Sequence, residues 1–133
     1  MIKLRRTKAD ELFSLYVRHR DNYTCQRCKL YVQPPTNEIH CAHYHSRAKR
    51  SVRFDEENAI ALCRKCHLYF DGNSWLRQDS HKEDFYLFML NKLGQKRFNT
   101  LMFRANTPAK VDEKLICIWL EDKLKSLGIR YFK

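Results

Sequence analysis

The sequence lacks an apolar run long enough to cross a membrane and a glycine-rich loop of the kind that cradles phosphate. A membrane helix needs roughly 18 uninterrupted apolar residues, and no window of the chain approaches that length. The N-terminal run MIKLRR is charged where a secretory signal would be apolar. We therefore expect a soluble protein of the reducing cytosol, with no membrane partner and no small-molecule cofactor.

Acidic residues are few: 15 Asp and Glu stand against 26 Lys and Arg, which gives a net charge of +11 over 133 residues. An excess of this size in a small chain most often reflects a polyanionic partner, and nucleic acid is the default. Internal repeats and low-complexity segments are also missing. We expect one domain over residues 1–133, with a helical C-terminal extension over residues 80–128.

Six cysteines are present, and four of them form two Cys-x-x-Cys pairs, Cys25 with Cys28 and Cys63 with Cys66. Two such pairs separated by a loop and a hairpin match the four-sulfur pattern of structural zinc sites, in which no coordination position is left open. Two unrelated reduced pairs, or two disulfides, are the alternatives. The pattern predicts one Zn²⁺ held by all four thiolates.

Local patterns predict the elements around these pairs. A capping-box spacing from Thr7 to Asp10 precedes apolar residues at helical intervals, which indicates an N-terminal helix. Residues 39–44 and 58–62 are compatible with two short strands, joined by a charged loop over residues 46–57. A helix should start near Cys63 and end at residues 71–73. The fold class is therefore small α+β, a β-hairpin plus helix stapled by zinc and flanked by helices.

The remainder of the chain is predicted to be helical. Ser80 and Glu83 repeat the capping-box spacing, and Gly94 and Gly128 are typical helix stops. Apolar stripes at helical intervals predict that these helices face a core. The stripe residues are Phe85, Phe88, Met89, Phe98, Leu101, Met102, Ala105, Val111, Leu115, Ile118 and Trp119.

The segment over residues 23–73 carries a family resemblance. A Cys-x-x-Cys turn is followed by a strand bearing His43, then Asn58 before the second strand, then the run LCRKCH that ends at His67. This order resembles the HNH endonucleases, which have the ββα-metal fold, and the run CAHYHSR at residues 41–47 is most similar to small HNH nucleases of bacteriophages. The resemblance implies a metal-dependent DNA endonuclease, either nicking or cutting both strands, with a four-cysteine zinc site.

The resemblance also implies roles for the three residues of the name. His43 is the general base that activates water, Asn58 holds the hairpin and so positions the base, and His67 binds one catalytic divalent cation, such as Mg²⁺ or Mn²⁺. Phosphodiester hydrolysis needs these functions in any case, because a neutral imidazole can accept the water's proton and a divalent cation can stabilise the phosphate and the leaving oxygen.

The chain departs from the family pattern at Ala42, where many members carry a further metal ligand. Waters and the DNA phosphate could complete the coordination, or Cys41, His40 or His45 could be recruited. Strand alternation places Cys41, His43 and His45 on one face, so His45 is the preferred accessory ligand or phosphate contact. The alternative is that His40 and His45 are exposed loop residues.

Basic residues after the base strand are expected to contact DNA phosphates, and they are Arg47, Lys49, Arg50 and Arg53. Arg47 and Arg53 belong to the phage-like form of the motif and are favoured. Phage relatives are associated with the DNA-packaging terminase, which implies packaging proteins as a second partner and the host cytoplasm as the location. The alternative function is a catalytically silent zinc-knuckle adaptor that binds nucleic acid.

Overall fold

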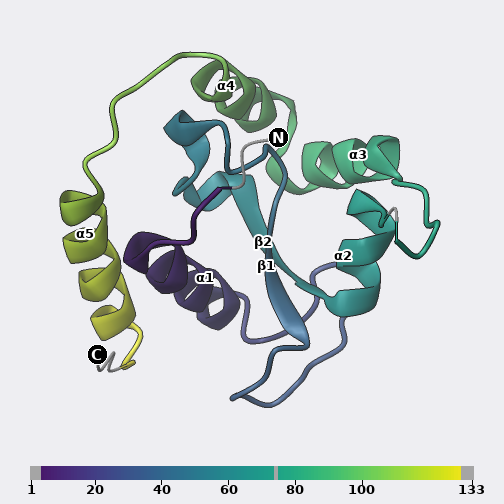
Figure 1. Cartoon of the computed structure of the whole chain (residues 1–133), viewed down its shortest axis with the longest axis horizontal. Coiled ribbons are helices and arrows are strands. Elements are labelled where there is room, and N and C mark those ends of the chain that lie inside the picture. The colour runs from purple at the N-terminus through teal and green to yellow at the C-terminus, as the bar shows by residue number, and fades with distance from the viewer. Residues whose placement is uncertain (1–3, 74, 130–133) are drawn as a thin grey trace.

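The computed structural model describes residues 4–73 and 75–129, and it shows a small α+β fold (Figure 1). Within this part of the chain there are five α-helices and a two-stranded antiparallel hairpin. None of these helices is long and apolar enough to cross a membrane. The elements are α1 (Lys8–Arg20), β1 (Ile39–His43), β2 (Ala59–Cys63), α2 (Arg64–Asp71), α3 (Lys82–Leu93), α4 (Gln95–Ala105) and α5 (Glu113–Ser126), with 3₁₀ turns at Arg50–Val52 and Glu56–Asn58.

The hairpin lies between two groups of helices, with α1 and α5 against one face and α2, α3 and α4 against the other (Figure 1). The strands pair in a register that sets His43 opposite Ala59 and Ile39 opposite Cys63. Side chains alternate across a strand, so Ala42 joins the core on the α2 side while Cys41 packs towards α1. The predicted hairpin followed by a helix is therefore confirmed, with the end of β1 and both ends of β2 shifted by one residue.

Aromatic residues dominate the core on the α2 side of the hairpin. The rings of Phe70 in α2 and Phe85 in α3 stack with centroids 4.4 Å apart. Phe98 and Leu101 of α4 are fully buried in the same cluster. Five of the stripe residues predicted to face a core in α3 and α4 are buried there: Phe85, Met89, Phe98, Leu101 and Ala105. Phe88 is partly buried against this core, whereas Met102 is 37% exposed.

The capping box predicted at the start of α1 is confirmed, because Thr7 and Asp10 exchange both hydrogen bonds. α1 then buries Leu12 and Phe13 against α5 and the hairpin. The core stripe predicted for α5 is only partly correct: Trp119, and Val111 just before the helix, pack against this core, but Leu115 and Ile118 are 63% and 64% exposed. The helix instead turns its buried face towards α1 through the two positions that pack there, Leu120 and Leu124.

The capping box predicted at Ser80 does not form. α3 begins at Lys82 with His81 as its N-cap, and no side chain caps it. The backbone N–H of His81 instead donates to the carbonyls of Tyr69 and Phe70, and its ring stacks on Tyr69 with centroids 3.9 Å apart. Contact with the end of α2 therefore sets the start of α3, an interaction that a local pattern does not encode.

Candidate functional site

The four cysteines of the two Cys-x-x-Cys pairs meet in space and form a group able to hold a metal ion such as zinc. Their sulfur atoms all lie within 4.8 Å of one another, and the Sγ atoms of Cys28 and Cys63 are 3.7 Å apart. A tetrahedral zinc with Zn–S bonds of about 2.3 Å requires sulfurs separated by about 3.8 Å. The observed spacing fits that requirement, and the cysteines are free thiols rather than disulfides.

Electrostatics of the cluster favour a bound cation. Burial opposes ionisation of Cys25, but backbone N–H groups of Cys28, Cys63 and Arg27 outweigh it and lower the pKa of this thiol to about 7. Burial and the neighbouring sulfurs raise the pKa of Cys66 to about 12. Ionisation of one thiol thus disfavours ionisation of its neighbours, because like charges in contact repel. A divalent cation removes that conflict, which is why this donor set suits a metal.

The cluster fixes the start of α2. Cys63 is both the last residue of β2 and the N-cap of α2, and its sulfur accepts a hydrogen bond from the backbone N–H of Cys66. The first pair has the same turn, with the N–H of Cys28 donating to the sulfur of Cys25. His67 follows Cys66 directly, so the cluster also sets where the imidazole of His67 emerges from the helix.

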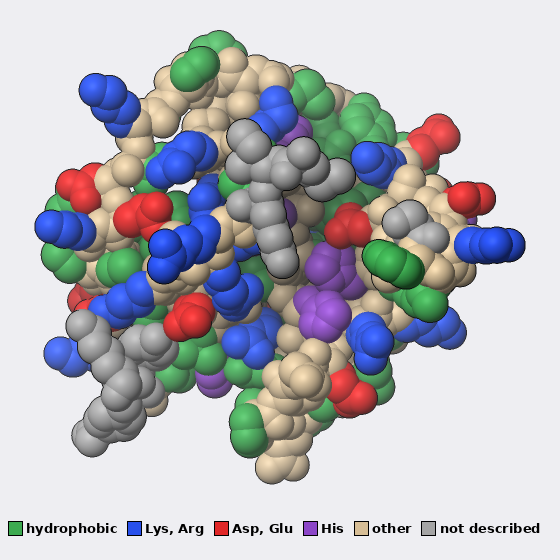
Figure 2. Space-filling model, in the orientation of Figure 1, with side chains coloured by type: hydrophobic (Ala, Val, Ile, Leu, Met, Phe, Trp, Pro, Cys, Tyr) green, Lys and Arg blue, Asp and Glu red, His purple; other side chains and the backbone are tan. Residues whose placement is uncertain are grey.

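A cleft of ≈ 800 Å³ lies along β1 between α1 and α2. Because one edge of β1 pairs with β2, the cleft follows the other edge and receives side chains from both faces of the strand. Figure 2 shows histidines at the centre of one face of the molecule with Lys and Arg side chains around them. The lining residues include His40, His43, His67, Asp10, Asp71 and the cations Arg6, Arg18, Arg47 and Lys82.

His43 is held in one tautomer within this cleft. Its Nε2 lies 2.9 Å from the backbone carbonyl oxygen of Arg53, and a carbonyl can only accept, so Nε2 carries the proton. Nδ1 of the neutral ring is then free to accept another proton. Burial lowers the pKa of His43, and the nearby charge of Arg47 lowers it further, against the opposing effect of the Arg53 carbonyl. His43 is therefore neutral at pH 7.

Asn58 ties the loop that follows β1 to the start of β2. The side chain is fully buried, and its oxygen accepts from the N–H of His45 at 2.7 Å. Its amide nitrogen donates to the carbonyls of His45 and Val52, both at 3.0 Å. These three bonds fix the backbone on both sides of residues 46–51, and the same loop carries the Arg53 carbonyl that orients His43.

His67 lies between a histidine and a carboxylate. Nε2 of His40 is 3.1 Å from the carbonyl of Asn37, so this nitrogen donates and Nδ1 of a neutral His40 accepts. That Nδ1 is 2.9 Å from Nδ1 of His67, which leaves Nε2 of His67 facing a carboxylate oxygen of Asp71 at 2.9 Å. His67 and Asp71 are therefore a pair of donor atoms suited to a divalent cation, oriented from behind by His40.

Asp71 is a site residue that sequence reasoning missed. The signal was present, because Asp71 stands four residues after His67 and α2 brings positions i and i+4 to one face. His40 was considered as a ligand, and the structure places it behind His67 instead. Among residues 4–73 and 75–129, only the four cysteines form a group of three or more possible metal ligands, so the cleft offers a pair rather than a complete set.

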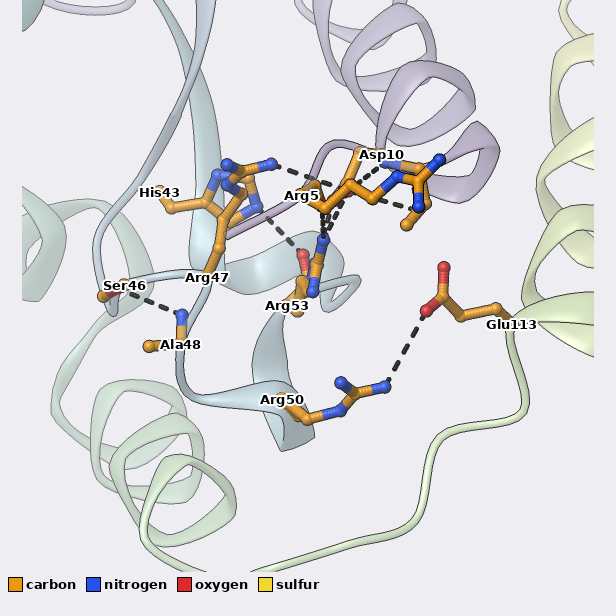
Figure 3. Close-up of polar contacts among 10 residues, drawn as sticks. Arg5, Asp10, His43, Ser46, Arg47, Ala48, Arg50, Arg53 and Glu113 are labelled. Carbon is orange, nitrogen blue, oxygen red and sulfur yellow. Dashed lines mark hydrogen bonds and ion pairs between the residues drawn. The ribbon is translucent and has the colours of Figure 1, made fainter. Parts of the chain in front are cut away.

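Arg53 is not placed to contact DNA. Its side chain is only 4% exposed, and its guanidinium donates to both carboxylate oxygens of Asp10 and to the carbonyl of Arg5 (Figure 3). Burial alone would raise the pKa of Asp10, but the hydrogen bonds and charge of Arg53, with Thr7, outweigh it and lower that pKa. The predicted phosphate contact is thus replaced by a buried ion pair beside His43.

Arg47 is the one predicted phosphate contact that lines the cleft. A guanidinium nitrogen of Arg47 lies 3.5 Å from a carboxylate oxygen of Asp10 (Figure 3). Lys49 donates to Asn106, and Arg50 lies 3.7 Å from Glu113, so both point away from the cleft towards α4 and α5. The other cations of the cleft are Arg6, Arg18 and Lys82.

His45 and Ala42 also differ from their expected surroundings. β1 ends at His43, so the alternation that grouped His45 with His43 does not extend to it. The ring of His45 is absent from the cleft lining, and its Nε2 is buried with no hydrogen-bond partner among the described residues. Ala42 is fully buried in the core on the α2 side and does not line the cleft.

No family model, curated protein or solved structure matches the chain. The geometry of the cleft and of the four-cysteine cluster is therefore the basis for inferring a function.

Proposed function

We propose that the protein is a metal-dependent DNA endonuclease of the HNH type. The observation that supports this best is the cleft itself, which is lined by His43 from β1, by the His67–Asp71 pair from α2 and by basic residues. A nucleic-acid-binding module needs the basic walls but has no use for an oriented neutral histidine opposite a pair of metal-binding atoms. The net charge of +11 supports a polyanionic substrate.

His43 is the general base in this proposal. With Nε2 donating to the Arg53 carbonyl, Nδ1 accepts a proton from the water that attacks phosphorus. The lowered pKa keeps the ring neutral at cellular pH, which is the state a base requires. Asn58 acts as a positioning residue, because its three hydrogen bonds hold the loop that supplies the Arg53 carbonyl.

His67 and Asp71 are the residues that would hold the catalytic cation, and Asp71 supplies the ligand that Ala42 cannot. A bound Mg²⁺ or Mn²⁺ would neutralise charge on the phosphate and stabilise the leaving 3′ oxygen. His40 keeps Nδ1 of His67 engaged, so that Nε2 remains available beside Asp71. The four-cysteine cluster holds a structural Zn²⁺ that is separate from this pair and saturated by protein ligands.

The walls of the cleft bind the DNA backbone through Arg6, Arg18, Arg47 and Lys82. If each contacts one phosphate, the logarithm of affinity falls with the logarithm of salt concentration at a slope of roughly −3 to −4. A flat salt response would contradict this backbone contact.

The second candidate is a catalytically silent adaptor that binds nucleic acid, as in phage DNA packaging. It is favoured by the small number of possible metal ligands in the cleft, because among the described residues only the cysteines form a group of three or more. Under this alternative the zinc cluster and the basic cleft keep their roles, while His43 has none.

Plasmid cleavage separates the two. Wild type should cut supercoiled DNA with Mg²⁺ or Mn²⁺ and not after chelation, with zinc content checked in parallel. His43→Ala and Asp71→Asn should each lose about 100-fold or more in rate, as expected for a general base and a metal ligand. His19→Gln, a half-buried histidine outside the cleft, is the matched control. Cleavage that survives His43→Ala removes His43 as base; no cleavage with any metal leaves the adaptor.

A further inference from the structure

The most exposed large apolar side chain in the described part of the chain is Trp75, which is 93% exposed. Leu76 beside it is 63% exposed. An indole in water is costly, because its large apolar surface gains nothing from solvent. Trp75 is not part of the core, so its indole is available to bind a ligand.

The turn that carries Trp75 is firmly built. Asn73 and Gln78 form an antiparallel bridge with backbone bonds of 2.8 and 2.9 Å. The side-chain oxygen of Asn73 also accepts from the N–H groups of Trp75 and Leu76. At Gly72, a Cβ would lie 2.6 Å from the backbone nitrogen of Ser80, so the two arms of the turn approach as closely as a glycine allows. These hydrogen bonds tie the backbone of Trp75 and Leu76 to Asn73.

The two ends of the turn lie at the cleft. The turn leaves α2 immediately after Asp71 and enters α3 at Lys82, and both of these residues line the cleft. Arg77 adds a positive charge within the turn and Asp79 a negative one, so the turn has little net charge of its own. Charge attraction to a polyanion must come from the cleft walls, and the turn contributes an aromatic face.

We infer that Trp75 stacks on an unpaired DNA base while the backbone of the same strand lies in the cleft. The inference rests on the proposed function and adds a substrate class to it. The bases of a duplex cover one another's faces, so an indole can stack only on a base that has left its stack. The preferred DNA is therefore single-stranded or carries a bulge or mismatch. Aromatic stacking tolerates any sequence, because every base has a π face.

The test measures binding of short labelled oligonucleotides by fluorescence anisotropy, in the His43→Ala background so that the DNA stays intact. Zinc is kept throughout. Trp75→Ala should weaken binding to single-stranded DNA about tenfold, the typical loss for one stacked base, whereas Trp75→Phe should stay within about threefold of the parent. Binding to a fully paired duplex should be unchanged. The salt dependence of affinity should also be unchanged, because no charge has been removed.

Phe103→Ala is the matched control, since Phe103 is a 71% exposed aromatic residue on α4 that does not line the cleft. It should bind every oligonucleotide as the parent does. Both variants remove exposed side chains, so the fold should survive, which circular dichroism checks.

Each failure has its own signature. Parent protein that binds no DNA would remove the proposed function and this inference together. Parent that binds, with Trp75→Ala equally tight on single strands, would overturn the stacking role and leave the nuclease proposal intact. Equal losses on duplex and single strand would overturn the preference for unpaired bases. A change in sedimentation without a change in DNA affinity would assign the turn to contact with a second copy and overturn the inference.

Discussion

The four-cysteine cluster and the cleft share helix α2 but are assembled in different ways. All the donor atoms of the cluster come from two short turns, and each turn is closed by its own N–H to sulfur bond. The cleft draws its groups from α1, β1, α2 and the first residue of α3, which are separated by stretches of sequence. The cluster is thus built from two copies of the same local turn, whereas the cleft forms only when the whole fold is in place. This difference sets how each should respond to substitution.

Loss of one cluster thiol should have the largest effect. Structural zinc sites of this kind contribute apparent free energies of about 10–16 kcal/mol, against about 5–15 kcal/mol for the whole stability of a domain. Cys63→Ser removes a ligand and should leave the protein largely unfolded at room temperature, with less than one zinc retained after dialysis. Circular dichroism and metal analysis measure both. Cys117→Ser, on α5 outside the cluster, should keep its fold and its zinc; equal zinc in the two variants would refute the four-cysteine site.

Substitution of Arg53 should come next, because it leaves Asp10 charged and buried without its partner. Breaking a buried ion pair in this way costs about 3–5 kcal/mol. Arg53→Ala should therefore shift denaturant unfolding strongly. Arg50→Ala, whose side chain is 58% exposed, should change stability by about 0.5 kcal/mol or less. Similar small effects of the two variants would show that Arg53 is not the structural residue described here.

Asn58→Ala tests the clamp of the cleft loop. It removes three hydrogen bonds from a fully buried side chain, and the stranded backbone groups should cost about 3 kcal/mol of unfolding free energy. Asn99→Ala, at an exposed position on α4, is the control and should have almost no effect. If Asn58→Ala retains full stability yet loses cleavage, then the asparagine acts directly in the reaction and not through the loop.

The smallest effect is the titration of His43. Its pKa lies below the ordinary histidine value near 6.5, so the unfolded chain takes up the proton first as pH falls. The stability that neutral His43 contributes is present above that value and is lost as the pH falls through the folded pKa. NMR titration of the His43 ring should give a midpoint below 6.5. Arg47→Gln removes a charge that lowers this pKa and should raise the midpoint; an unchanged midpoint would exclude Arg47 as a cause.

The same difference explains which features the sequence could predict. The four-cysteine cluster was predictable, because each Cys-x-x-Cys turn specifies its own geometry and only the meeting of the two turns needed the fold. The hairpin and the helix that follows were predictable from the same segment. Asn58 was expected to hold the hairpin, and its hydrogen bonds do so.

Other features needed the packed structure. Arg47 and Arg53 are six residues apart and look alike in the sequence, yet one lines the cleft and the other is buried, because only Arg53 meets Asp10 from α1 in a bidentate pair. His45 was the preferred accessory ligand but does not line the cleft, because β1 ends before it. His40 lines the cleft instead and contacts His67. Leu115 and Ile118 are spaced one helical turn apart, as are the buried Leu120 and Leu124. Only contact with α1 decides which of these two sides of α5 is covered.

The edge of β1 that forms the floor of the cleft has a further consequence, for the behaviour of the protein in concentrated solution. An unpaired strand edge is a template on which another chain can add a strand, and proteins commonly guard such edges with positive charge or with flanking helices. Here α1 and α2 stand on either side of β1, and the arginines along the walls repel an approaching copy of equal charge. If the proposed function holds, the same arginines would both attract the DNA backbone to this edge and oppose strand addition by a second copy of the chain.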